Sequence, residues 1–170
     1  MRRSSGFTIV EIIVVLLLIS ILAATVLGRS ITSSTIDLNA ATDKIRNQLR
    51  YAQSQAMKRS DTVWGIRSDA VNKQYWLFRV TPNAPTSTEQ VLIPGGDYAA
   101  GGTSVSFANL GADLNDFTLV FDRFGRPYKG QTNGVPNSPV AKEDNPIVKI
   151  TKGEERKITI TPETGFCVIQ

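Results

Sequence analysis

The sequence contains no histidine and only one cysteine, Cys167. Without histidine, the chain can form neither a Ser-His-Asp nor a Cys-His nucleophile arrangement, and it can form no metal site built on imidazole. A lone cysteine excludes an internal disulfide, a CxxC redox pair and a cysteine-rich zinc site. We therefore expect no enzymatic activity, no cofactor and no metal site.

The charge balance gives little support for any one class of partner. The net charge of the 170 residues is +4, and Arg2 and Arg3 contribute half of it. Hydrophobic residues make up 41% and charged residues 20% of the chain. These values are typical of one globular domain combined with one strongly apolar element.

An apolar run follows the two arginines, and Glu11 is its only ionisable residue between Phe7 and Leu27. A membrane-spanning helix needs roughly 20 predominantly apolar residues, and this run is that long. Three interpretations are open: a secretory signal cleaved near Ala23 and Ala24, a plain single-pass anchor, or a segment in which Glu11 has a function. A charge inside a membrane helix is by default a functional hypothesis.

The stretch Gly6-Phe7-Thr8-Ile9-Val10-Glu11 resembles the prepilin processing signature of type IV pilins and of the pseudopilins of type II secretion. The resemblance implies that a prepilin peptidase cleaves between Gly6 and Phe7 and that Phe7 is then N-methylated. Cleavage leaves an amine one helical turn from Glu11. An amine and a carboxylate that are each costly in lipid neutralise one another when paired. Glu11 would then bind its own amine or that of a neighbouring subunit, and so serve assembly.

A helix is expected to continue from Phe7 to about Arg59. One apolar face recurs at helical spacing, and it comprises Leu38, Ala41, Ile45, Leu49, Ala52 and Ala56. The opposite face is net basic. We expect it to be exposed to solvent, and the alternative is that it binds anionic lipid head groups or DNA. Gly28 and the Ser/Thr-rich residues 30–35 lower helix propensity, and they predict a kink or local melting.

Short β-branched and aromatic stretches replace the helical pattern after residue 59. The expected strands are residues 62–67, 73–80, 91–93, 105–107, 117–121, 147–150, 157–161 and 166–169. Loops rich in Gly and Pro separate them, including residues 130–139. The pattern predicts an α+β fold in which the amphipathic helix packs on a C-terminal antiparallel β-sheet domain.

Two further segments resemble the minor pseudopilins of the GspH/FimT type. The first is residues 117–127, which end in Phe121-Asp122-Arg123-Phe124-Gly125-Arg126-Pro127, and the second is residues 158–165, which end in Thr164-Gly165. The resemblance implies a β-sandwich against the helix. The residues themselves predict a turn in which Asp122 is the cap and Gly125 supplies the unusual backbone angle.

Together these features predict four segments: a leader at residues 1–6, a transmembrane and filament-core helix at 7–28, an amphipathic helix at 29–59, and a periplasmic β domain at 60–170. The resemblance implies a minor pseudopilin or minor type IV pilin anchored once in the bacterial inner membrane. It would assemble with other pilin or pseudopilin subunits at the start or tip of a pseudopilus or pilus. The type of machine stays open.

Two alternatives remain. One is a plain membrane-anchored β domain, and the other is a DNA-binding minor pilin that would use the basic residues Arg123, Arg126, Lys129, Lys142, Lys149, Lys152, Arg156 and Lys157. The acidic residues 113–116 and 143–145 do not have the spacing of an EF-hand, so we expect no calcium site there. The alternation around Cys167 favours a buried thiol, with a partner cysteine on another subunit as the alternative.

Overall fold

The computed structural model describes residues 8–59, 61–81, 86–98 and 101–170, without the side chains of residues 26–33. The chain divides into two compact units, Met1–Ile36 and Asp37–Gln170. Each unit is described by itself.

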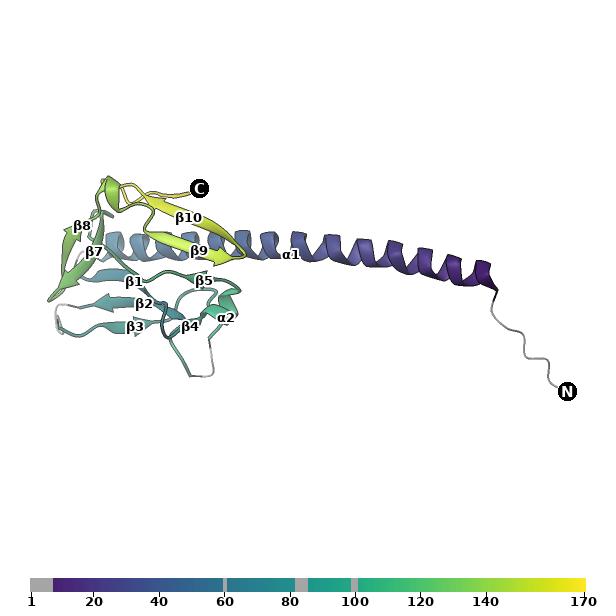
Figure 1. Ribbon diagram of the computed structural model, residues 1–170. Helices are drawn as coiled ribbons and strands as arrows, with labels where there is room; N and C mark the ends of the chain where they lie inside the picture. Colours follow the sequence, from purple (N-terminus) through teal and green to yellow (C-terminus); the bar gives the residue numbers. More distant parts are fainter. Residues whose placement is uncertain (1–7, 60, 82–85, 99–100) are drawn as a thin grey trace. The chain divides into compact units, whose positions relative to one another are not determined.

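The first unit contains the beginning of helix α1 (Ile9–Lys58; Figure 1). Its apolar side chains are exposed, with exposed fractions between 49% for Val15 and 78% for Ile9. The backbone is helical through residues 28–35, so the local melting expected there is absent. Helix propensity is a weak preference of at most about 1 kcal/mol per residue for these residue types, and it does not by itself end a helix. Within the described residues, no helix has the length and apolar character required to cross a membrane.

In the second unit, one face of α1 is buried. The exposed fraction is at most 2% for all six residues of the predicted apolar face: Leu38, Ala41, Ile45, Leu49, Ala52 and Ala56. This prediction is confirmed. Thr42 is buried beside them, and its hydroxyl donates a hydrogen bond of 2.7 Å to the carbonyl oxygen of Leu38.

Two antiparallel sheets make up most of the remaining described residues of this unit. The larger sheet has the order β3-β2-β1-β6-β7-β8, with β4 also paired to β2, and the smaller sheet has the order β11-β10-β9-β5. The strands of the larger sheet are β1 (Val63–Asp69), β2 (Gln74–Val80), β3 (Glu89–Val91), β4 (Val105–Ser106), β6 (Phe117–Phe121), β7 (Pro127–Thr132) and β8 (Val135–Pro139). Those of the smaller sheet are β5 (Asp113–Leu114), β9 (Val148–Lys152), β10 (Glu154–Ile160) and β11 (Cys167–Ile169).

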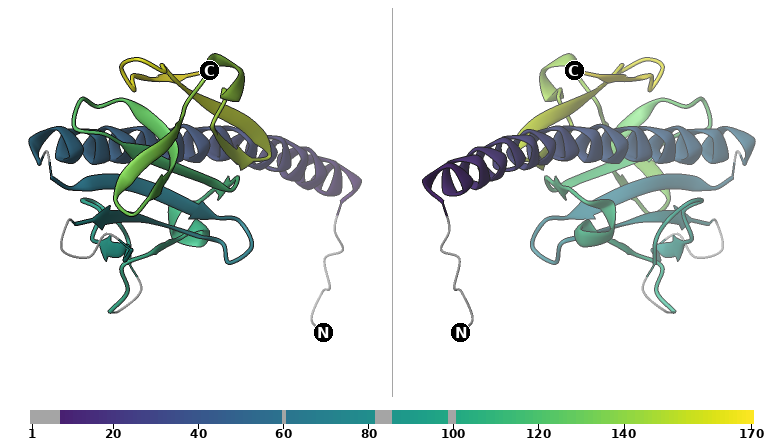
Figure 2. Two further views of the ribbon diagram at one scale, coloured as in Figure 1. Left: turned by 90° about the vertical axis from the view of Figure 1, so that its left-hand side faces the viewer. Right: turned by 90° about the vertical axis from the view of Figure 1, so that its right-hand side faces the viewer.

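One main hydrophobic core joins α1 to both sheets. It contains the apolar helix face together with residues such as Ile66 and Leu119 of the larger sheet and Ile150 and Ile158 of the smaller one. In Figures 1 and 2 the helix segment after Ile36 runs with β9 and β10 on one side and β1 to β3 on the other. The predicted α+β fold, a helix packed on an antiparallel β domain, is confirmed.

Residues 130–139, expected to form a loop, instead contribute most of the hairpin β7–β8, and that expectation is wrong. Its turn is Asn133-Gly134, with φ angles of 52° and 76°. Asn-Gly is a strong signal for a tight hairpin turn, because both residues tolerate positive φ. The strands on either side contain prolines and polar residues instead of the usual apolar alternation, so strand propensity alone does not predict them.

A short helix, α2 (Phe107–Leu110), and a 3-10 turn, η1 (Lys142–Asp144), complete the unit. Phe107 was expected to end a strand. It begins α2 because the hydroxyl of Ser106 accepts a hydrogen bond from the N–H of Asn109, and Gly111 closes the helix with φ 79°. This helix cap takes the place of a continued strand.

Candidate functional site

Helix α1 starts immediately after Thr8, and Glu11 lies in its first turn. The N–H of Glu11 donates a hydrogen bond of 3.3 Å to the hydroxyl of Thr8. Thr8 and Glu11 have the Thr-x-x-Glu spacing of a capping box, in which the acid at the third helical position belongs to the helix start. A carboxylate in the first turn also interacts favourably with the helix dipole. The spacing of Thr8 and Glu11 is thus a sequence signal for the start of this helix.

Glu11 lies at the edge of an apolar surface. Its side chain borders a hollow with Ile12, Val15 and Leu16, and the neighbouring side chains of α1 are exposed and apolar. The predicted processing residues, Gly6 and Phe7, lie outside the described residues. The structure thus places Glu11 at the start of the helix, close in sequence to the amine that cleavage before Phe7 would create.

The predicted turn after β6 is built around the Asp122 carboxylate. Its Oδ1 atom accepts hydrogen bonds from the N–H groups of Phe124 (2.9 Å) and Arg126 (2.8 Å). Gly125 has φ 78°, and its N–H donates to the carbonyl oxygen of Asp122 at 3.0 Å. Pro127 then begins β7, and Phe121 is fully buried in the core. The carboxylate therefore holds the turn closed from inside.

A second turn, at Thr164 and Gly165, lies against the first. The side chain of Gln53 on α1 joins them, because its Nε2 atom donates to the carbonyl oxygens of Gly125 (2.9 Å) and Thr164 (2.7 Å). Gly165 has φ 66°, and a Cβ atom there would lie 2.4 Å from the Gly125 oxygen. Two motifs about 40 residues apart in sequence thus meet at one helix residue. Sequence analysis missed Gln53, which carries no local motif.

Replacing Gln53 by alanine is expected to lower the free energy of unfolding by about 2 kcal/mol. The substitution removes two hydrogen bonds, and each such bond contributes about 0.5–1.5 kcal/mol net. Urea unfolding of the full chain in detergent measures the change. Gln55→Ala, a glutamine on the same helix that is outside this contact, is the control. An equal loss in both variants would contradict the role of the bridge.

Cys167 is 2% exposed, and its thiol faces the core. Burial raises the pKa of this thiol to about 11, while Arg50 and Arg46 oppose the shift. Because the folded state favours the protonated thiol, this contribution to stability is fully present below the ordinary pKa and is lost as pH rises toward about 11. A protonated, buried thiol is neither a good nucleophile nor an accessible one.

Native Cys167 is therefore expected to react with iodoacetamide at pH 8 at least about a hundredfold more slowly than the same thiol in urea. Mass spectrometry of the alkylated protein measures both rates. The unfolded chain is the internal control, because it has the same single thiol without burial. Rapid alkylation of the folded protein would show that the thiol is available to another subunit.

Ion pairs engage half of the basic residues considered for DNA binding. Lys129 pairs with Asp144 (2.7 Å), Lys152 with Asp37 (2.7 Å), and Lys157 with Glu155 (3.3 Å). Arg156 lies 3.9 Å from Glu154. These pairs neutralise charge in the C-terminal third, which reduces the field available for phosphate groups.

Carboxylates in the two acidic stretches considered for calcium binding form ion pairs and hydrogen bonds with other residues. Asp113 pairs with Lys73 at 2.9 Å, and Asp116 accepts a hydrogen bond of 2.6 Å from the N–H of Ala70. Asp144 pairs with Lys129, and hydrogen bonds from Lys129 and the backbone of Ala141 lower its pKa. In the part of the chain that the structure describes, no group of three or more Asp, Glu, Cys or His residues could hold a metal ion.

Two family models match the chain. The model described as the prokaryotic N-terminal methylation motif matches residues 1–27, and the model described as type II transport protein GspH matches residues 41–139. The second match covers more than half of the 170 residues. It contains α1 from Ala41 to Lys58, Gln53 and the Asp122 turn. No curated protein and no solved structure matched the chain.

Proposed function

The chain belongs to the GspH family of type II transport proteins, and we propose that it is a minor subunit of a type II secretion pseudopilus or a type IV pilus. In this proposal the precursor is anchored in the bacterial inner membrane with its β domain in the periplasm. A prepilin peptidase cleaves it between Gly6 and Phe7, and Phe7 is N-methylated. The processed subunit then joins other pilin or pseudopilin subunits at the start or tip of the fibre.

The observation that carries this proposal is the combination of two features in one chain. The methylation motif includes an apolar helix segment that exposes its side chains, and the GspH match covers the later part of the same helix, which is buried on one face by a β domain. A helix that is apolar on all sides requires an apolar environment, which is either lipid or other such helices. The first half of α1 therefore suits storage in a membrane and packing in a fibre.

Glu11 supplies the assembly contact in this proposal. Cleavage before Phe7 leaves an amine at the start of a helix whose first turn contains the Glu11 carboxylate. An amine and a carboxylate in an apolar medium are strongly favoured as a pair. Pairing between neighbouring subunits would make the docking of each new subunit favourable.

The DNA-binding alternative receives less support from the described residues. Four of the eight basic side chains on which it depends are engaged with carboxylates. The resulting surface has mixed charge, and non-specific DNA binding requires a concentrated positive field.

N-terminal sequencing and intact-mass measurement of the protein isolated from the native membrane test the processing step. The mature chain is expected to begin at Phe7 and to carry one added methyl group. Gly6→Val should leave the full-length chain in the membrane, because the residue before the cleaved bond has changed. A wild-type chain that begins at Met1 or Thr25 would overturn the proposal.

A further inference from the structure

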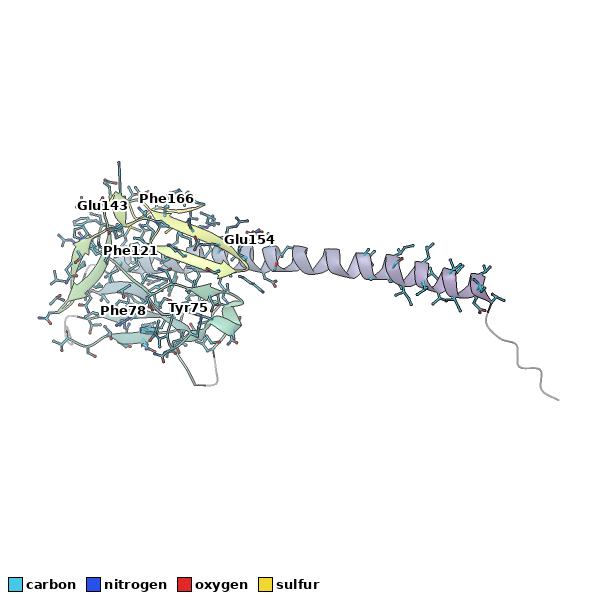
Figure 3. The ribbon with its side chains drawn as sticks, viewed as in Figure 1. Tyr75, Phe78, Phe121, Glu143, Glu154 and Phe166 are labelled. Atoms are coloured by element: carbon cyan, nitrogen blue, oxygen red, sulfur yellow. The ribbon has the colours of Figure 1, made fainter. Side chains whose placement is uncertain are left out.

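The two turns joined by Gln53 present an exposed patch of apolar and basic side chains. Phe124 is 64% exposed, Phe166 is 55% exposed and Met57 is 50% exposed. The Met57 sulfur approaches the Gly125 turn, and Phe166 follows directly after Gly165. Figure 3 shows Phe166 at the outside of the unit, whereas Phe121 lies within it. We call this surface, with Arg50, Arg123 and Arg126, the Gln53 patch.

The three arginines of the Gln53 patch lie on its aromatic rings. The Arg50 guanidinium is 5.4 Å from the centre of the Phe166 ring, and those of Arg123 and Arg126 are 4.8 Å and 5.9 Å from the centre of the Phe124 ring. The face of an aromatic ring attracts a nearby guanidinium without using its N–H groups as hydrogen-bond donors, so these groups can still donate to an anion.

These arginines differ from half of the lysine and arginine side chains in the described part of the unit. Eight ion pairs engage eight other lysine and arginine side chains, but none of these pairs includes Arg50, Arg123 or Arg126. The Asp122 carboxylate beside them accepts two hydrogen bonds from the backbone within its turn. The patch therefore has positive charge with which an external anion could pair.

The patch is also held rigidly. Asp122 closes the turn that carries Phe124, and Gln53 ties this turn to the one that precedes Phe166. A surface that is ordered before binding loses less conformational entropy when a partner docks. Arginine and aromatic residues are enriched among the residues that contribute most to protein–protein binding.

The positions of the guanidinium groups favour a protein partner over a nucleic acid. Single-stranded nucleic acids bind when bases stack on free aromatic faces. In the patch, guanidinium groups already lie over the Phe124 and Phe166 rings. Carboxylates can pair with the guanidinium edges without displacing these groups, while the exposed methionine and ring edges contact an apolar side chain.

We propose that the Gln53 patch docks a protein surface in which carboxylates surround an exposed apolar side chain. The proposal goes beyond the function given above, because neither cleavage at Phe7 nor the pairing of Glu11 uses these residues. It assigns to the subunit a second contact surface, on its β domain. It also specifies that the partner surface is acidic with an apolar centre.

The test uses the full chain purified in detergent and a fluorescein-labelled peptide in which glutamates flank a Leu-Phe pair. Fluorescence anisotropy is expected to show saturable binding that weakens as salt is added. The variant Arg123→Glu with Arg126→Glu should bind this peptide at least about fivefold more weakly, because two favourable charge contacts become repulsive. The same variant should prefer a matched peptide in which lysines replace the glutamates.

The matched control is Lys142→Glu with Lys149→Glu, which makes the same change in net charge at two exposed cations outside the patch. It should keep nearly wild-type affinity, and Phe124→Ala should lose affinity although all charges remain. Unchanged thermal unfolding midpoints would show that the variants fold. Equal losses in both charge variants, or no saturable binding by the wild type, would overturn the proposal. Tighter, patch-dependent binding of an oligo-dT strand would also overturn it, by identifying a nucleic-acid site.

Discussion

Replacement of Glu11 by alanine is expected to reduce incorporation into fibres by about a hundredfold while the chain still reaches the membrane. Breaking a buried pair between an amine and a carboxylate costs about 3–5 kcal/mol, and each 1.4 kcal/mol corresponds to a factor of ten. Removing a carboxylate from an apolar helix also makes membrane insertion more favourable. Quantitative blotting of sheared fibres and of membranes measures the two amounts separately.

Glu11→Gln distinguishes the two roles of this residue. Glutamine can replace glutamate in a capping box, so it preserves the local helix start that Thr8 and Glu11 form, but it cannot pair as an anion with the Phe7 amine. If charge pairing drives assembly, Glu11→Gln should fail as severely as Glu11→Ala, and Thr8→Val should have only a small effect. If Glu11→Gln restores assembly, the acid serves only as a helix cap.

Replacement of Gly165 by alanine is expected to lower the free energy of unfolding by about 3 kcal/mol or more. The φ angle of 66° already costs a residue with a side chain about 1–2 kcal/mol. The new Cβ would also lie 2.4 Å from the Gly125 oxygen and 2.6 Å from the Gln53 Nε2 atom, so the turns must separate. That separation breaks the two hydrogen bonds donated by Gln53, which adds about 1–3 kcal/mol.

Gly153→Ala is the matched control for this prediction. Gly153 has φ 75°, close to that of Gly165, but apart from its chain neighbours no described residue has an atom within 4 Å of the position of its Cβ. It should therefore show only the cost of the backbone angle, about 1–2 kcal/mol. Urea unfolding of both variants in detergent measures the loss in the free energy of unfolding for each. Equal losses would show that the contact between residue 165 and Gly125 does not contribute to stability.

The features that sequence analysis predicted correctly in the fold are those set by local periodicity. The helix face from Leu38 to Ala56 follows from a spacing of three and four residues, because such residues share one side of a helix. The turn at Asp122 and Gly125 also depends on residues within four positions of each other. At these positions the burial of the side chain and the backbone angle can be predicted from residues close by in the sequence. No contact with a distant residue is needed for the prediction.

The missed elements had different causes. The hairpin at Asn133-Gly134 and the hydrogen bond from Glu11 to the Thr8 hydroxyl both have local signals. The polar, proline-containing strands hid the first signal, and the apolar run hid the second. Gln53 has no such signal. It is one of several polar residues on α1, and only the approach of two turns from the β domain gives its amide two acceptors.

The sequence by itself determined that this protein has one long helix, a β domain and a processing motif, because periodicity and short motifs are properties of neighbouring residues. Only the tertiary structure decided that the Asp122 and Thr164 turns meet at Gln53. It also placed there, around two exposed phenylalanines, three arginines that form no ion pair with the described residues. Those contacts join residues far apart in the chain. Their energies depend on distances that are set by the packing of the whole domain, and no local pattern encodes them.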